Sequence, residues 1–165
     1  MKVVAKMRPD PATTPGRSAA ATVARYVGAL ALIVTGAAHL QQYYAVYFRV
    51  IPTIGPLFLV NFVVGVGLGL ALLAPLQNRA PEVHRLAAIG GIVFSAGTIV
   101  GLAISENGTL FGFHEHGYRS AIVVSLIAEA VAIVSLAAYL IGSRQSASTP
   151  GRRPSFRTQP GASPS

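Results

Sequence analysis

The stretch AIVVSLIAEAVAIVSLAAYLI, residues 121–141, carries one carboxylate, Glu129, in the middle of an otherwise almost entirely apolar run. A membrane-spanning helix needs about 20 predominantly apolar residues, so this run is long enough to cross a bilayer. Three similar runs precede it, at about residues 24–41, 54–76 and 86–104. The sequence therefore predicts an all-α fold, an integral membrane bundle of four helices.

Composition supports a membrane protein over a soluble one. Only 11% of the 165 residues are charged, against roughly 25% in an ordinary soluble domain. The apolar runs leave no room for a soluble domain between them. We expect a four-helix domain over residues 24–142, with helices at about 24–48, 54–76, 84–105 and 118–142. The flanking segments, 1–23 and 143–165, are rich in small, basic and Pro residues and are expected to be disordered tails.

The net charge of +8 comes from basic residues placed around the apolar runs. Eleven of the thirteen Lys and Arg residues lie in the two tails, at the start of the first run (Arg25) or between the second and third runs, and only Arg49 and Arg119 lie elsewhere. The positive-inside rule then predicts a multi-pass protein of the cell membrane with both termini in the cytoplasm. The expected partners are the bilayer and anionic lipids at its cytoplasmic face, not nucleic acid.

Two alternatives concern the ends of the first run. A cleaved signal peptide would need a shorter basic segment before the apolar stretch, so a retained membrane anchor is expected. The run is followed by aromatic residues that suit the headgroup region, which favours interfacial anchoring over ligand binding. These aromatic residues are Tyr43, Tyr44, Tyr47 and Phe48.

Several classes of chemistry are disfavoured. The chain has no cysteine, which excludes disulfides, thiolate metal sites and cysteine nucleophiles. It contains no nucleophile elbow, Walker loop or HExxH motif, so an enzyme is not predicted. Only His39 among the histidines lies inside an apolar run, which disfavours a haem held between helices. No inverted repeat is detectable, which disfavours an autonomous secondary transporter.

Polar residues within the runs predict a layer inside the membrane. A carboxylate such as Glu129 is costly in lipid and usually faces a bundle interior with a partner. At 1.5 Å per residue, one polar residue from each run falls about 9–12 Å below the outer boundary. These four residues are His39, Asn61, Thr98 and Glu129.

Helical periodicity places small and polar residues on one face of each run, where they would allow close helix packing. The Gly65–Gly69 and Gly97–Gly101 steps are expected to pack closely. The four faces are Gly28, Leu32, Thr35 and His39; Asn61, Gly65 and Gly69; Ala87, Gly91, Ser95, Thr98 and Ser105; and Ser125, Ala128, Glu129, Ala132 and Ser135.

The segment FGFHEHGYR, residues 111–119, is predicted to form an outward-facing loop. His114 and His116 would point to the same side of an extended chain and could hold a divalent metal, with Glu106 or His39 completing the site. The alternative is an exposed loop without metal, and no other cofactor is predicted. His84 is expected to be solvated on the other side of the membrane.

The segments ARYVGALALIVTGAAHLQQYY, IPTIGPLFLVN and LFGFHEHGYRSAIVVSLIAEAVA resemble small four-helix membrane proteins of bacteria that are known only as uncharacterised proteins. The resemblance covers about residues 25–140. The first segment is also similar to the DoxX-like group of four-helix proteins, which implies a redox-linked or envelope accessory role. No residue roles follow from either resemblance.

Two functional hypotheses follow. The first is a non-enzymatic accessory or interaction subunit of the cell envelope, with a membrane-protein partner or a homo-oligomer. The second is a small ligand-binding or proton-coupled protein, for a quinone, lipid or metal, with an outward-facing pocket around His39, Asn61 and Glu129 and with Thr98 as a further candidate. In the second hypothesis the HEH segment would cover the pocket, whereas in the first the same polar residues would only link the helices.

Overall fold

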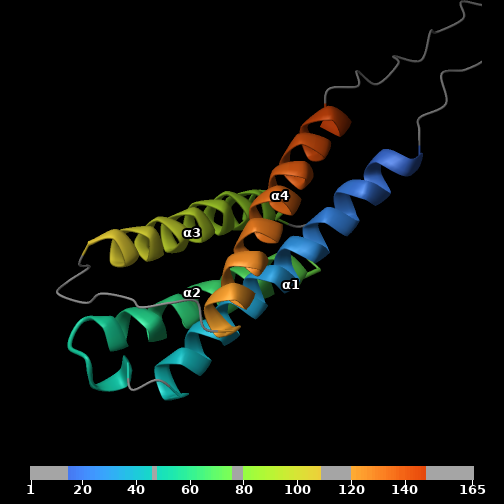
Figure 1. The fold of residues 1–165 in the computed structure, drawn as a ribbon. Helices are drawn as coiled ribbons and strands as arrows, with labels where there is room; N and C mark the ends of the chain where they lie inside the picture. Colours follow the sequence, from blue (N-terminus) through green and yellow to red (C-terminus); the bar gives the residue numbers. More distant parts are fainter. Residues whose placement is uncertain (1–14, 46–47, 76–79, 109–119, 148–165) are drawn as a thin grey trace, which may run out of the picture.

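The computed structural model describes residues 15–45, 48–75, 80–108 and 120–147. These residues form four long helices and one short 3-10 helix, packed as a bundle (Figure 1). The helices are α1 (Pro15–Ala45), η1 (Phe48–Val50), α2 (Ile54–Leu73), α3 (Pro81–Asn107) and α4 (Ser120–Ala147). The predicted all-α four-helix architecture is thus confirmed.

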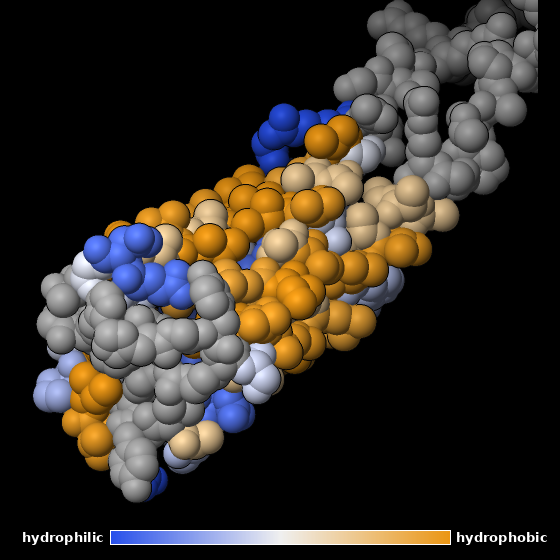
Figure 2. Space-filling view, viewed as in Figure 1, coloured by the Kyte–Doolittle hydropathy of each residue, from blue (hydrophilic) through white to orange (hydrophobic). Residues whose placement is uncertain are grey.

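All four helices are long and apolar enough to cross a membrane, over Ala19–Ala45, Ile54–Leu73, Pro81–Asn107 and Ser120–Arg144. The surface agrees with this assignment, because a broad hydrophobic band covers the middle of the molecule and hydrophilic residues gather towards its two ends (Figure 2). Many large apolar side chains of the helices are exposed, including Leu86 at 67% and Val134 at 69%. Exposed apolar surface of this extent is stable only against lipid or a partner. The chain is a multi-pass membrane protein.

The helix bounds differ from the sequence-based ones at several ends. α1 begins at Pro15 and α4 continues to Ala147, so parts of both expected tails are helical. Alanine has the highest helix propensity, and the Ala-rich segment after Ser18 extends the apolar run by more than a turn. Proline suits the first helical position, where its missing N–H would have had no partner in the helix. The remaining tail residues lie outside the described part of the chain.

The helices alternate in direction, so the bundle has two distinct ends (Figure 1). We call the end that carries Pro15, Leu73, Pro81 and Ala147 the terminal end, and the end that carries Ala45, Ile54, Asn107 and Ser120 the opposite end. α1 packs along both α2 and α4, and α3 packs against α2 and α4 with few contacts to α1.

The core lies towards the terminal end, where α1 meets the other three helices. Its buried side chains include Leu32 from α1, Leu72 from α2 and Leu136 from α4, together with small residues of α3 such as Ala88. The four small and polar faces predicted from periodicity are largely the buried faces of their helices, with Thr35, Ser95 and Ala132 each fully buried.

The Gly65–Gly69 step brings α2 against the backbone of α1, as predicted. A Cβ atom on Gly69 would lie 2.8 Å from the carbonyl oxygen of Ala29, and one on Gly65 would lie 3.0 Å from that of Leu32. Gly97 does not pack in this way, so the prediction of close packing is wrong at this glycine. Nothing lies within 4 Å of a Cβ placed on Gly97, and both glycines border a cavity instead.

α2 is preceded by a tight chain reversal. The amide of Ile54 donates to the carbonyl of Pro52 at 2.9 Å, and the amide of Gly55 donates to that of Ile51 at 3.0 Å. Thr53 adopts a positive φ of 72° within this turn, a conformation that is uncommon for a residue with a side chain. The turn buries Ile54, which is only 2% exposed, beside the same cavity.

Candidate functional site

A cavity of about 350 Å³ lies between the four helices in the half of the bundle nearer the opposite end. Its lining combines a few polar side chains with a larger apolar surface. His39 and Gln42 come from α1, Ile54, Leu57, Phe58 and Asn61 from α2, Val93, Phe94, Gly97, Thr98, Gly101, Leu102 and Ser105 from α3, and Ile122, Ser125, Leu126 and Glu129 from α4.

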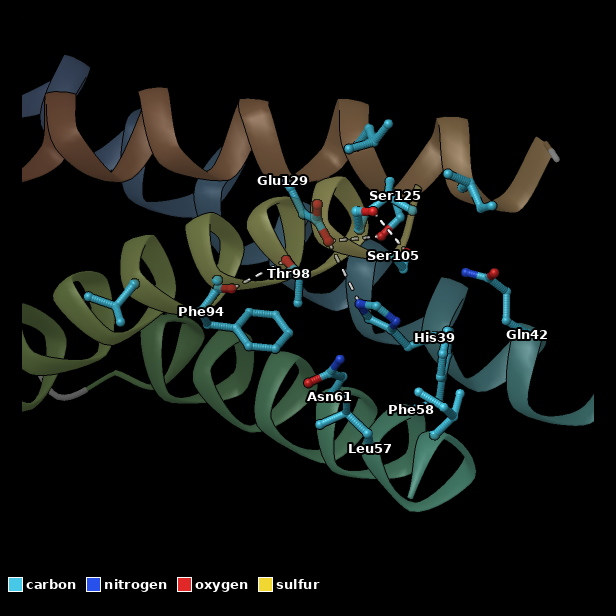
Figure 3. A pocket seen from close by; sticks show the side chains of 17 residues that line it. His39, Gln42, Leu57, Phe58, Asn61, Phe94, Thr98, Ser105, Ser125 and Glu129 are labelled. Atoms are coloured by element: carbon cyan, nitrogen blue, oxygen red, sulfur yellow. Dashed lines mark hydrogen bonds and ion pairs between the residues drawn. The ribbon is translucent and has the colours of Figure 1, made fainter. Parts of the chain in front are cut away.

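The structure brings together the four polar residues that sequence reasoning placed in one layer. His39, Asn61, Thr98 and Glu129 come from four different helices and line the same cavity. In Figure 3 the His39 ring, the Asn61 amide and the Glu129 carboxylate are directed into one space between the helices.

Glu129 is the carboxylate of this site and is 2% exposed. Its Oε1 accepts a hydrogen bond of 3.0 Å from the Ser125 hydroxyl, one helical turn earlier in α4. The same oxygen lies 3.7 Å from Nε2 of His39 in α1. This distance is longer than a hydrogen bond, for which N–H···O separations are about 2.7–3.2 Å. The imidazole and the carboxylate therefore lie close together without a direct hydrogen bond. A third group beside them could form a hydrogen bond with each.

His39 is positioned by aromatic side chains rather than by hydrogen bonds. Its ring meets that of Phe58 edge-on, with centroids 5.3 Å apart, and that of Phe94 at 6.4 Å. The residue is 8% exposed, and neither ring nitrogen has a hydrogen-bond partner within the described part of the chain. Buried polar atoms in native proteins nearly always have such a partner. The imidazole thus retains unused donor and acceptor capacity beside the cavity.

Thr98 is a weaker candidate than the sequence suggested. Its hydroxyl donates to carbonyl oxygens of its own helix, to Ser95 at 2.9 Å and to Phe94 at 3.2 Å. The single hydroxyl hydrogen is therefore used in hydrogen bonds within α3, which leaves only the oxygen lone pairs to accept a hydrogen bond from a ligand. Ser105 is similar, because its hydroxyl donates to the Leu102 carbonyl at 2.8 Å.

The metal hypothesis receives no support from the described residues. His114 and His116 lie outside them. Glu106 lies in the last turn of α3, and among the described residues no group of three or more His, Asp or Glu side chains is placed to hold a metal ion.

Sequence reasoning missed several cavity residues that share a face with those it identified. Gln42 is one turn beyond His39 and is 3% exposed. Phe58 and Phe94 lie one turn before Asn61 and Thr98, respectively. Spacings of three and four residues place these side chains on one helix face, so the signal was present for Gln42. The two phenylalanines were indistinguishable from lipid-facing residues.

A second polar cluster lies nearer the terminal end and corrects the expectation that His84 is solvated. His84 is 1% exposed and Arg25 is 2% exposed. The Arg25 guanidinium donates to Nδ1 of His84 at 3.1 Å, and Nε2 of His84 donates to the Ala74 carbonyl oxygen at 2.9 Å. The cluster joins the first part of α1 to the end of α2 and the start of α3. His84 was misplaced because its sequence neighbours, Glu82 and Arg85, are surface residues.

No family model matches the chain, and neither a curated protein nor a solved structure is significantly similar to it. Of the expected resemblance, only the coarse feature is shown, namely four long apolar helices consistent with a four-helix membrane protein.

Proposed function

We propose that this protein binds a small ligand inside the membrane, in the cavity that His39 and Glu129 border. The observation that carries the proposal is the state of His39. Its ring is buried, has no hydrogen-bond partner among the described residues, and faces a cavity of about 350 Å³. A polar atom in this position is expected to have a partner, and a bound ligand supplies one.

The character of the cavity supports the same proposal. Ligand sites are typically about 300–1,000 Å³ in volume and mostly apolar, with a few polar groups that orient the ligand. Here Phe58, Phe94 and Leu57 contribute apolar surface, while His39 and Glu129 are the ionisable groups among several polar ones. Intramembrane ionisable residues are costly, and their presence at a cavity favours a functional role.

The His39–Glu129 pair also offers a route for proton coupling. The imidazole and the carboxylate can each hold or release a proton, and a hydrogen-bonding group placed between them would contact both atoms of the 3.7 Å pair. A ligand whose binding changes this contact would change where the proton resides. The proposal therefore includes a proton-coupled binding protein, but no chemical transformation.

The proposed orientation places both termini in the cytoplasm of a cell, with the cavity in the outer half of the membrane. The basic residues support this orientation, because Arg25, Arg85 and Arg144 lie in the halves of their helices nearer the terminal end, whereas Arg49 lies in η1 at the opposite end. The positive-inside rule assigns the more basic side to the cytoplasm. Anionic lipids are the expected contacts of the terminal end.

Native mass spectrometry of the protein, purified in mild detergent, tests the proposal. The wild-type chain should retain a small molecule, which Glu129→Gln and His39→Ala should each lose in part or entirely. Glu82→Gln is the matched control, because Glu82 is a surface carboxylate whose side chain is 73% exposed. Wild-type protein that carries only water in the cavity, with no retained molecule in any lipid background, would refute ligand binding.

The same preparation distinguishes the accessory-subunit hypothesis from ligand binding. A non-enzymatic envelope subunit without a ligand would co-purify with a partner chain or as a homo-oligomer. It would also tolerate Glu129→Gln with its assembly unchanged. A partner chain together with an empty cavity would favour this hypothesis over ligand binding.

A further inference from the structure

Exposed residues of α3 and half-buried residues of α2 line the cavity, so its rim reaches the outer surface of the bundle beside these two helices. Val93 lines the cavity and is also 66% exposed, so it stands at the rim. Gly97 follows one turn later on the same side of α3, is exposed, and has no atom within 4 Å of the place where a Cβ would stand. Leu57 and Asn61 of α2 line the same cavity and are only partly buried. The missing side chain of Gly97 therefore leaves a gap in the wall.

This gap lies at the depth of the acyl chains. At 1.5 Å per residue, Gly97 is about 15 Å from Asn107 and about 24 Å from Pro81 along α3. Both distances place it within a hydrocarbon core about 30 Å thick. The exposed side chains on either side of Gly97 in α3 are apolar. Val93 lies one turn before it, and Val100, which is 55% exposed, lies one turn after it. A molecule that enters here comes from the bilayer and not from water.

The polar groups of the cavity select the head group of such a molecule. Among the described residues that line the cavity there is no Lys or Arg, and Glu129 is the only carboxylate. An anionic head group would be buried beside a carboxylate without a basic partner, which is strongly unfavourable. A hydroxyl group both donates and accepts, so it can donate to Glu129 Oε1 and accept from His39 Nε2, which are 3.7 Å apart. A carbonyl group can only accept and cannot donate to the carboxylate.

We infer that the ligand is a lipid-borne, uncharged amphiphile with a hydroxyl head group, which enters from the bilayer between α2 and α3 past Gly97. The inference rests on the proposed function and specifies its ligand class and its route. The cavity volume of about 350 Å³ is near the lower end of the range for ligand sites, which suits one apolar chain better than two.

Photolabelling of the full chain in phosphatidylcholine vesicles tests the inference. The probe is a long-chain primary alcohol with a diazirine in its chain. The comparison probes are an alkyl sulfonate of the same length, which is permanently anionic, and a short-chain water-soluble alcohol. Mass spectrometry identifies the labelled residues. We expect the long-chain alcohol to label the cavity residues, and unlabelled long-chain alcohol to compete with it, whereas the two comparison probes should label them weakly.

Glycine variants test the route. Gly97→Leu adds a side chain at a position where no atom lies within 4 Å of the Cβ site, and it should lower cavity labelling by about tenfold or more, which corresponds to a modest change in binding free energy. Gly97→Ala adds a smaller side chain and should lower the labelling of the cavity residues less than Gly97→Leu does. Gly67→Leu is the matched control, because Gly67 is an exposed glycine of α2 that does not line the cavity and also has no atom within 4 Å of its Cβ position.

The outcomes separate the inference from the proposed function. Equal labelling by the sulfonate overturns the hydroxyl head group. Equal labelling by the short-chain alcohol, with no effect of Gly97→Leu, overturns bilayer entry and leaves ligand binding in place. If no probe labels the cavity although the purified protein retains a small molecule, the ligand class is wrong and the proposed function stands. If no probe labels the cavity and the purified protein retains no small molecule, both the inference and the proposed function are wrong.

Discussion

Nε2 of His39 in α1 lies 3.7 Å from Oε1 of Glu129 in α4, although ninety residues separate them in the chain. Each residue is more than nine-tenths buried. The pair crosses the interface along which α1 and α4 pack most extensively, and it faces the cavity on one side. Its position suggests that it contributes to helix association as well as to binding.

A double-mutant cycle should detect this contribution. We expect His39→Gln and Glu129→Gln each to destabilise the bundle and to be coupled by about 1 kcal/mol, the scale of polar contacts between membrane helices. The measurement is thermal or steric-trap unfolding in detergent for the wild type, both single variants and the double variant. Strictly additive effects would show that the two side chains do not interact.

The glycine contact between α1 and α2 should be intolerant of any side chain. A Cβ on Gly69 would lie 2.6 Å from Cγ1 of Ile33 and 2.8 Å from the Ala29 carbonyl oxygen. Gly69→Leu must therefore separate the two helices, and we expect it to destabilise the protein by at least about 1–3 kcal/mol, the usual cost of overpacking. Thermal unfolding of the purified protein measures this effect.

Gly67→Leu provides the control for that experiment, because it adds the same side chain to the same helix in open space. We expect its effect on unfolding to be within about 0.5 kcal/mol, as for most surface substitutions. Similar destabilisation by both variants would mean that the leucine acts through α2 alone and not through the contact with α1.

The Arg25–His84 cluster should stabilise the terminal half of the bundle. His84→Phe removes the 2.9 Å donor of the Ala74 carbonyl oxygen and one acceptor of the Arg25 guanidinium. Loss of a buried hydrogen bond that leaves a polar group unsatisfied costs about 1–3 kcal/mol. Loss of stability of this size should appear in unfolding experiments and in faster hydrogen exchange at the end of α2.

Arg85→Leu is the matched control for the cluster. Arg85 forms a surface ion pair with Glu82, at 3.7 Å, and its side chain is 53% exposed. Such pairs contribute about 0–1 kcal/mol. If Arg85→Leu and His84→Phe had equal effects, the loss would reflect the basic charge near the helix start and not the buried hydrogen bonds.

The orientation can be tested by reporter fusions. A reporter that is active only outside the cytoplasm should be active when fused after Gly112 and inactive when fused after Asn78. The physical reason is that eleven of the thirteen basic residues would otherwise have to be on the outer side. The reverse activity pattern would invert the proposed topology and place the cavity in the cytoplasmic half.

Local pattern was sufficient to predict the helices. The apolar runs identify four spans because a bilayer requires uninterrupted apolar helices, whatever the packing between them. The buried face of each helix also followed from the sequence, since small and polar residues at three- and four-residue steps are costly towards lipid. Depth alone grouped His39, Asn61, Thr98 and Glu129, and the structure places all four around one cavity.

Contacts between helices could not be read from these patterns. The Gly65–Gly69 and Gly97–Gly101 steps are equivalent as sequence, yet the first packs against α1 and the second borders a cavity. The difference depends on which helix lies opposite each step. His84 is a similar case, because its burial depends on Arg25 of a helix that begins far away in the sequence.

The sequence by itself determined that this chain crosses a membrane four times and that each helix presents a small and polar face inward, because hydrocarbon penalises every exposed polar group. Only the tertiary structure decided that His39 meets Glu129, that the His39 ring nitrogens lack hydrogen-bond partners within the described part of the chain, and that Gly97 leaves a gap towards lipid. These relationships depend on how four helices are placed around one another, which helical period and depth do not specify.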